Sequence, residues 1–262
     1  MRRHPPGSPP PFALFPAAIA TFFLVLPIAG IISRMPWSTL DELLRSSKLT
    51  EPLRLSILVS VSATVLTVIL GVPLALVLAR MEFRGRNVLR AAILLPLVLP
   101  PVVGGTALFF ALGRRGLLGG ALGAMGIQLP FTTAGAVVAA TFVAMPFLVI
   151  SVEGSLRAMS TDLEAAAATL GARRSTQLLL VTLPRIRTSI AAGAALAWAR
   201  ALGEFGATIT FAGNQPGRTQ TLPLAVYLSF QTDPEAALAL SLVLLTVSVG
   251  VLVILRNHLV GR

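Results

Sequence analysis

Long apolar runs separated by short polar segments make up most of this 262-residue chain. Each run has about 20 residues, the length that a helix needs to cross a hydrocarbon core of about 30 Å. The runs cover residues 12–32, 55–79, 91–112, 134–152, 190–212 and 236–255. This pattern predicts an all-α integral membrane protein with about six transmembrane helices, and we treat residues 1–262 as a single transmembrane domain.

The first run has two interpretations. It follows Arg2 and Arg3, and a basic start before an apolar stretch is also typical of a secretory signal peptide. The run is longer than a usual signal core, and no clear small-x-small cleavage site precedes Arg34. We therefore expect a retained first span.

The third run contains residues that interrupt helices. Proline removes a backbone donor and kinks a helix, so this run is not expected to be one straight helix. The interrupting residues are Pro96, Pro100, Pro101, Gly104 and Gly105. Broken backbone at membrane depth is tolerated where it is buried in protein or faces a watery cavity, so the run is either a kinked packing helix or part of a pathway lining.

The longest polar interruption lies at about residues 155–188. Thr161 and Glu164 have the spacing of a capping box, which predicts a helix beginning near Asp162. Gly171 can adopt the left-handed conformation that ends a helix. A second helical piece carrying Arg173 and Arg174 is expected to follow and to end before a proline at position 184.

This segment is either a solvated loop with helical tendency or a helix-turn-helix element that a partner binds. Apolar positions at i, i+3, i+4 and i+7 would form one face of its first helix. These positions are Leu163, Ala166, Ala167 and Leu170.

The composition also indicates a membrane protein. The chain is 55% hydrophobic and 12% charged, and a water-soluble globule of this composition could not cover its apolar side chains. Its formal charge of +11 would suggest nucleic acid in a soluble domain, but the basic residues fall mainly between apolar runs. We therefore expect contact with membrane lipid and no nucleic-acid partner.

The distribution of basic residues predicts an orientation. With both termini in the cytoplasm, thirteen of the 21 basic residues fall in inside segments and seven in outside segments. Positively charged residues are enriched in cytoplasmic loops, so this bias favours the proposed orientation. It places the 155–188 segment in the cytoplasm, where ATP is present.

The sequence offers little chemistry of its own. Cysteine is absent, and the two histidines, His4 and His258, lie at opposite ends of the chain. No Gly-x-x-x-x-Gly-Lys-Ser/Thr loop occurs, so the familiar cradle for ATP phosphates is missing. We expect no catalytic residue, no metal site and no bound cofactor, and an energy source must then come from a partner.

The fifth run contains the ionisable pair Arg200 and Glu204, with Thr208 one turn further along. Residues four apart share a helix face, and charges at this depth either pair with one another or face a cavity. The pair is therefore either a salt bridge that fixes packing or part of a translocation path or gate, where Arg200 would attract an oxyanion.

The 155–188 segment resembles the cytoplasmic loop of ABC importer permeases, in which a coupling helix sits in a groove of the ATPase subunit. The match departs at one position, because the acid expected first in the family's Glu-Ala-Ala triplet is Ala165 and the nearest acid, Glu164, comes one residue early. The matching residues are Ala165, Ala166, Ala167, Gly171, Val181, Leu183 and Pro184.

Further motifs are similar to the molybdate branch of the molybdate/sulfate permease family. They include Ala199-Arg-Ala-Leu-Gly-Glu-Phe-Gly-Ala207, Thr219-Gln-Thr-Leu-Pro-Leu-Ala-Val-Tyr227 and Gly113-Arg-Arg-Gly-Leu117. The resemblance covers nearly all of the chain from the second span onward. It implies a type I ABC importer permease fold with a cytoplasmic coupling helix.

The resemblance also implies partners and roles. Two copies of this subunit would form a homodimer in the bacterial cytoplasmic membrane, with two ATP-binding subunits that hold ATP and Mg²⁺ and an external molybdate-binding protein. The implied ATPase-coupling residues are Thr161, Asp162, Glu164, Ala165, Ala166, Ala167, Gly171, Arg173 and Pro184.

Three alternatives to molybdate import stay open at the level of sequence. The first is a sulfate or thiosulfate permease of the same kind. The second is a proton-coupled secondary transporter with Glu204 as the carrier, and the third is an uncoupled channel.

Overall fold

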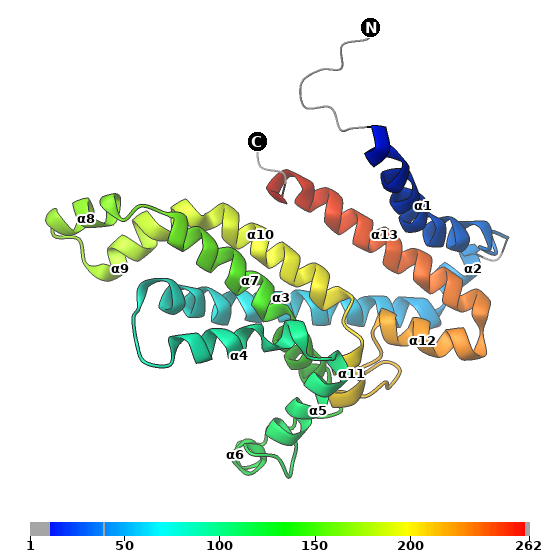
Figure 1. The fold of residues 1–262 in the computed structure, drawn as a ribbon. Coiled ribbons are helices and arrows are strands. Elements are labelled where there is room, and N and C mark those ends of the chain that lie inside the picture. Colours follow the sequence, from blue (N-terminus) through cyan, green and yellow to red (C-terminus); the bar gives the residue numbers. More distant parts are fainter. Residues whose placement is uncertain (1–10, 39, 260–262) are drawn as a thin grey trace, which may run out of the picture.

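The computed structural model describes residues 11–38 and 40–259, and every regular element within these ranges is a helix (Figure 1). The predicted all-α class is therefore confirmed. Arg2, Arg3 and Arg262, which entered the charge count for the termini, lie outside the described residues, as does His4.

Five helices of the described part are long and apolar enough to cross a membrane. By length and composition, they correspond to five of the six predicted spans. The fourth of them reaches back to Arg174, through shorter helical pieces that precede α10. The helices are α1 (Pro11–Ser33), α3 (Ser47–Arg80), α7 (Thr133–Ala158), α10 (Leu183–Leu202) and α13 (Pro234–Leu259).

The third predicted span is divided into two shorter helices, α4 (Arg86–Val98) and α5 (Pro101–Leu112). Leu99 and Pro100 between them have ψ values of 135° and 131°, so the backbone is extended at the break. A residue before proline is driven out of the helical region, which accounts for the interruption at Pro100 and Pro101. The predicted kink is confirmed.

The fifth predicted span, residues 190–212, was expected to be one helix, and this expectation is wrong. Helix α10 ends at Leu202, and a separate short helix, α11 (Gly206–Phe211), follows. Phe205 has φ −127° and ψ −57°, outside the helical geometry of its neighbours. Glycine weakens a helix interior, and Gly203 is the C-cap residue of α10, where the break begins.

Several helices extend beyond the apolar runs that predicted them. Helix α3 begins at Ser47 instead of about residue 55, and α7 continues to Ala158 instead of residue 152. The 34 residues of α3 would span about 51 Å, more than the hydrocarbon core requires. Hydropathy marks the part of a helix in lipid, whereas backbone hydrogen bonding continues into water.

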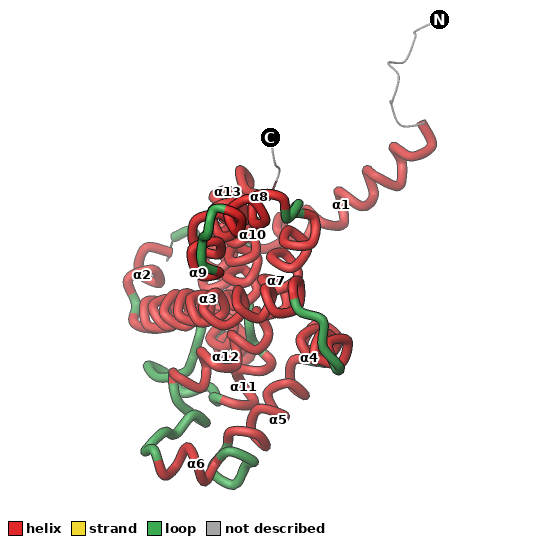
Figure 2. The backbone as a smooth tube through the Cα atoms, turned by 90° about the vertical axis from the view of Figure 1, so that its left-hand side faces the viewer, coloured by secondary structure: helices red, strands yellow, loops and turns green. Residues whose placement is uncertain are grey.

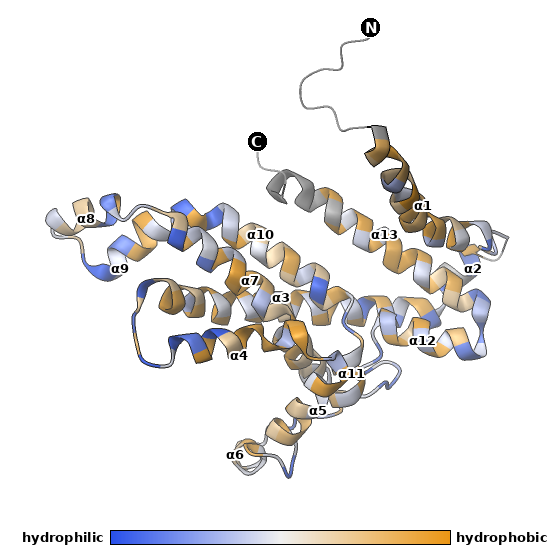
Figure 3. Cartoon of the chain, in the orientation of Figure 1, coloured by the Kyte–Doolittle hydropathy of each residue, from blue (hydrophilic) through white to orange (hydrophobic). Residues whose placement is uncertain are grey.

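The segments expected as outside loops also contain short helices. These are α2 (Leu40–Arg45), α6 (Gly119–Ala124) and α12 (Leu222–Thr232). Figure 3 shows hydrophilic residues at the ends of the long helices and around the short ones, and hydrophobic residues along the long helices between them.

Helix α7 lies against α3 and α10 and supplies more buried apolar residues than any other helix of the described part (Figure 1). Its buried positions are dominated by small side chains such as Ala136, Ala140 and Ala144, all fully buried. Small residues allow helix backbones to approach closely in a membrane, where packing rather than water exclusion holds helices together. Leu148, Val152 and other branched residues complete the main hydrophobic cluster.

Helix α1 projects away from the rest of the bundle, as Figure 2 shows from the side. None of the residues in its apolar window is buried. The faces of α1 and the outer face of α3 carry large exposed apolar side chains. Such a surface suits lipid or another protein chain, and it would not suit water.

Candidate functional site

The 155–188 segment folds into the predicted helix-turn-helix at one end of the bundle (Figure 1). Its first helix, α8 (Asp162–Thr169), is followed by Gly171 with φ +80°. The Ala172 amide donates to the Ala167 carbonyl and the Gly171 amide to the Ala168 carbonyl, both at 3.0 Å. This is the Schellman pattern, so the predicted role of Gly171 in ending the helix is confirmed.

The predicted capping box is wrong. The Thr161 side chain makes no capping hydrogen bond, and Ser160 takes its place. Ser160 Oγ accepts from the Asp162 amide at 3.2 Å and donates to Asp162 Oδ2 at 2.6 Å. The spacing rule failed because the Glu164 carboxylate is engaged by other elements of the fold.

Glu164 connects α8 to two other elements. Its Oε1 atom accepts from Thr182 Oγ1 at 2.7 Å and lies 3.1 Å from Arg80 Nη2. Arg80 is the last residue of α3, and Thr182 is the last residue of the π-helical turn η1 (Leu178–Thr182). The carboxylate therefore links α8 to the transmembrane bundle.

The apolar face predicted for α8 is exposed. Leu163 and Leu170 expose 54% and 88% of their surface, and Ala166 is also exposed. Arg173 and Arg174 are exposed beside this face, and α9 (Arg174–Gln177) begins there. An uncovered apolar strip next to basic side chains has the character of a protein-docking surface.

The second helical piece does not end before Pro184, so that prediction is wrong. Helix α9 continues through η1 into α10, and Pro184 lies in the first turn of α10. The Leu183 amide donates to the Leu178 carbonyl, five residues back, in the wider π-helical turn. Because the wider turn precedes it and proline needs no donor at a helix start, Pro184 is accommodated without a break.

Arg200 and Glu204 form the predicted ion pair, with Arg200 Nη1 2.7 Å from Glu204 Oε2. They do not share one helix as expected, because Glu204 lies in the break between α10 and α11. Its Oε1 atom accepts from the Ala207 amide at 2.8 Å, so the same carboxylate caps the start of α11. The pair holds the two helices of the fifth span together.

Glu204 and Thr208 are buried, with 2% and 1% of their surface exposed in the single chain, whereas the Arg200 side chain is 27% exposed. This geometry fits the packing interpretation of the pair. The alternative role of these residues at a translocation path or gate stays a prediction.

The broken third and fifth spans pack against one another through α5 and α11. A Cβ atom on Gly105 would lie 2.6 Å from the Ala207 carbonyl oxygen and would overlap Thr210 Oγ1. Only glycine permits this approach of the two backbones. The first residues after the two breaks are also close, because a Cβ atom on Gly206 would lie 2.7 Å from the Pro101 Cβ atom.

The sequence analysis missed a charged cluster centred on Glu153 in α7. Glu153 Oε1 lies 2.6 Å from Arg90 Nη2 and 2.9 Å from Arg157. Arg86 Nε also donates to the carbonyl oxygen of Leu78 at 2.9 Å. The i,i+4 spacing of Glu153 and Arg157 could have indicated one pair, but Arg90 is brought close only by the packing of α4 on α7.

Comparison with known protein families gives a match over residues 71–262. The matching family is described as the binding-protein-dependent transport system inner membrane component. The matched part includes the coupling segment and both broken spans.

Three curated relatives are similar over most of the chain. The molybdenum transport system permease protein ModB of Mycobacterium tuberculosis is 50% identical over 94% of this chain and 93% of its own length. ModB of Escherichia coli K12 is 38% identical over 82% and 96%. The sulfate transport system permease protein CysW of Synechococcus elongatus is 40% identical over 74% and 69%.

A solved structure has a similar fold. A chain in the crystal structure of a bacterial alginate ABC transporter, in complex with an alginate pentasaccharide-bound periplasmic protein, superposes with a TM-score of 0.72. The match covers 94% of this chain and 93% of that chain at 17% identity. The permease fold implied by the coupling motif is therefore confirmed.

Proposed function

The chain belongs to the family of binding-protein-dependent transport system inner membrane components, and from this premise we propose that it is the permease subunit of an ATP-driven molybdate importer. The observation that carries the proposal is the 50% identity to a molybdenum permease along almost the whole chain. The exposed apolar face of α8 supports a partner that supplies energy, because this chain has no phosphate-binding loop.

We further propose the assembly. Two copies of the permease would surround a central path, with two ATP-binding subunits against the coupling segments and an external binding protein on the opposite side. Both chain termini would lie in the cytoplasm. The family description names a binding protein and an inner membrane, and the basic-residue bias supports the orientation.

The contacts of Glu164 suggest how force would reach the spans. Movement of α8 would pull on Arg80 at the end of α3 and on Thr182 directly before α10. Helices α3 and α10 both pack on α7, so the three would move together as one body. Closure of the ATPase dimer would then change which side of the membrane the path faces, and hydrolysis would reverse it.

The break between α10 and α11 would act as the hinge for this motion. Hinges are a few residues at the ends of elements, and Gly203 and Glu204 occupy such positions. The ion pair of Glu204 with Arg200 would hold the two pieces in a defined orientation during the change.

A sulfate permease is the second candidate, because CysW is 40% identical over 74% of this chain. A proton-coupled mechanism has less support, since the Glu204 carboxylate is occupied by Arg200 and by the Ala207 amide. An uncoupled channel binds no ATPase and would not account for the exposed apolar face of α8.

Uptake by a reconstituted complex tests the proposal. The permease, its ATPase and its binding protein are placed in proteoliposomes, and entry of radiolabelled molybdate is followed with ATP supplied on the ATPase side. Molybdate uptake should require ATP and should resist competition by sulfate. Stronger competition by sulfate than by unlabelled molybdate would favour the second candidate, and uptake driven by a proton gradient alone would overturn both.

A further inference from the structure

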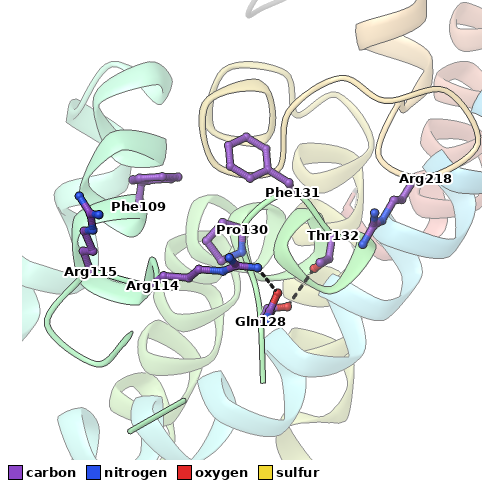
Figure 4. A pocket seen from close by; sticks show the side chains of 8 residues that line it. All are labelled: Phe109, Arg114, Arg115, Gln128, Pro130, Phe131, Thr132 and Arg218. Carbon is purple, nitrogen blue, oxygen red and sulfur yellow. Dashed lines mark hydrogen bonds between the residues drawn. The ribbon is translucent and has the colours of Figure 1, made fainter. Parts of the chain in front are cut away.

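A pocket rich in arginine lies far from the coupling segment (Figure 4). Its volume is about 520 Å³, and its lining includes Arg114, Arg115 and Arg218. Thr132 at its wall is the N-cap residue of α7, whose 26 residues end at Ala158 next to the coupling segment. A helix of that length spans about 39 Å, so the pocket is on the opposite side of the bundle, which the proposed function makes external.

The arginines of this pocket have no acidic partner among the described residues. Every ion pair of the described residues involves other basic side chains. Two basic residues elsewhere on the same side contrast with them, because Arg45 pairs with Asp41 and Lys48 with Asp233. No carboxylate lines the pocket either, so its positive charge is uncompensated.

Two of the arginines point toward the same part of the pocket. In Figure 4, Arg114 and Arg218 approach Gln128 and Thr132 from opposite sides, whereas Arg115 lies beside Phe109. Arg114 Nη2 donates to Gln128 Oε1 at 2.7 Å, a neutral acceptor that uses one of its five donors. Both arginines are exposed, and the Arg218 side chain donates no hydrogen bond to the described residues, so the remaining donors of both guanidinium groups can reach a ligand.

Helix α7 adds to this potential. Thr132 Oγ1 accepts from the Gly135 amide at 3.1 Å, which places the first turn of a long helix at the pocket wall. The N-terminus of such a helix carries a partial positive charge that favours anions. Thr133 Oγ1 donates to the Arg218 carbonyl oxygen at 2.8 Å and so fixes the Arg218 loop against this helix end.

The backbone beside the pocket is in an unusual conformation. Phe131 has φ +60°, the one positive value among the described residues that are not glycine. Bulky residues rarely adopt this region, and such strain concentrates at ligand sites. Phe131 makes an edge contact with Phe109, at a distance of 6.0 Å between ring centroids, and its backbone amide donates a hydrogen bond to the Phe211 carbonyl oxygen at 3.3 Å.

We propose that this pocket, between Arg114 and Arg218 at the N-terminus of α7, is an external binding site for a tetrahedral oxyanion such as molybdate or sulfate. This inference rests on the proposed function, which supplies the side of the membrane and the anion class. Two guanidinium forks can each bind such an anion through paired N–H donors, which lysine could not do. The site would hold cargo between its release by the binding protein and its entry into the path.

Equilibrium binding tests the site without transport. The complex of permease and ATPase subunits is placed in nanodiscs of neutral lipid at low ionic strength, without binding protein, and titrated with radiolabelled molybdate or sulfate. Wild type should bind either anion saturably. R114Q and R218Q should each weaken binding roughly tenfold, since loss of a charge-assisted contact of that kind is worth that much.

Matched variants separate the site from general effects. R54Q removes an exposed arginine outside the pocket and should leave binding unchanged. R218K keeps the charge without the fork and should bind more weakly than wild type but more tightly than R218Q. Thermal unfolding of each variant should equal that of wild type, because none of these arginines supports an ion pair.

Two results would overturn the site. One is unchanged anion binding in both R114Q and R218Q. The other is the absence of saturable anion binding by wild type; if R114Q and R218Q then also lose affinity for the anion-free binding protein, the arginines would be assigned to a carboxylate of that partner. ATP-driven molybdate uptake, measured separately, tests only the proposed function. Its result does not decide whether this site exists.

Discussion

At the scale of single residues, the carboxylate of Glu164 is the clearest link between the coupling helix and the spans. It is 20% exposed and contacts both Arg80 and Thr182, which belong to two different transmembrane elements. The family pattern expects an acid one position later, at Ala165, so the triplet alone did not support an ionic role for Glu164. The contacts with Arg80 and Thr182 give the carboxylate such a role.

We predict that Glu164→Ala reduces coupling more than stability. A partly exposed pair contributes at most about 1 kcal/mol to folding, so thermal unfolding should change little. ATP-driven uptake should fall by up to about tenfold, the effect of a coupling loss of about 1.4 kcal/mol. Glu82→Ala, which removes an exposed acid from the neighbouring loop, is the control and should leave uptake unchanged. Equal uptake by both variants would contradict the proposed route.

The Arg200–Glu204 pair gives a second prediction for single residues. Arg200→Met leaves a carboxylate that is 2% exposed without its cation and should destabilise the protein by about 3 kcal/mol. Glu204→Gln should cost less, because Arg200 is partly exposed and the glutamine oxygen can still accept from the Ala207 amide. The double variant should recover most of the loss in thermal unfolding. Lost uptake with unchanged stability in both single variants would instead indicate a role at the path.

At the scale of elements, the features that bear on function are the coupling helix and the two broken spans. Helix α8 is held on one side by Glu164 and exposes Leu163, Ala166 and Leu170 on the other. Helices α5 and α11 begin at breaks in the third and fifth spans and pack directly on each other. In the proposed mechanism, α8 would receive the force from the ATPase, and the breaks before α5 and α11 would allow the spans to change orientation.

A charge on the exposed face of α8 should prevent docking. We predict that Ala166→Glu abolishes co-purification of the ATPase with the tagged permease, because the carboxylate would be buried without a partner. Ala168→Glu, at an exposed position that lies outside the predicted apolar stripe, is the matched control and should retain the ATPase. Retention by Ala166→Glu, with a normal yield of folded permease, would exclude this face as the contact.

The contact between α5 and α11 should not tolerate a larger side chain. Gly105→Val would drive a Cβ atom into the Ala207 carbonyl and should lower stability by about 2 kcal/mol through overpacking. Gly120→Ala in α6 has no atom within 4 Å of the new Cβ and should be neutral or slightly stabilising. Thermal unfolding in detergent compares the two. A Gly105→Val variant as stable as wild type would mean that the two helices can separate easily.

At the scale of the whole molecule, the bundle exposes apolar side chains along its length and polar ones at its ends (Figure 3). This arrangement fits a multi-pass membrane protein, and the family match assigns an inner membrane. The direction in which the bundle crosses the membrane rests on the basic-residue bias alone.

Labelling tests that direction, and the absence of cysteine makes the natural chain a ready background. We predict that Arg173→Cys, in the exposed coupling turn, is protected from a membrane-impermeant thiol reagent in intact cells. Leu117→Cys, which replaces a side chain that is 91% exposed near the arginine pocket, should react with it. Reaction of the Arg173→Cys variant from outside would reverse the orientation and remove the proposed contact with an ATPase.

The sequence by itself determined the membrane class, five long spans, the kink at Pro100 and Pro101, and the turn at Gly171. These features follow from local properties, namely hydropathy over about 20 residues and the backbone limits of proline and glycine. The coupling segment was found in the same way, because its polarity and spacing are local.

Only the tertiary structure decided the rest. It separated α10 from α11, gave the cap of α8 to Ser160, and joined Arg90 to Glu153 across 63 positions of the chain. It also brought Arg114 and Arg218 together at the start of α7, from two loops about a hundred residues apart in the sequence. The physical reason is that ion pairs and pockets depend on which helices pack together, and sequence spacing shows only the neighbours within one helix.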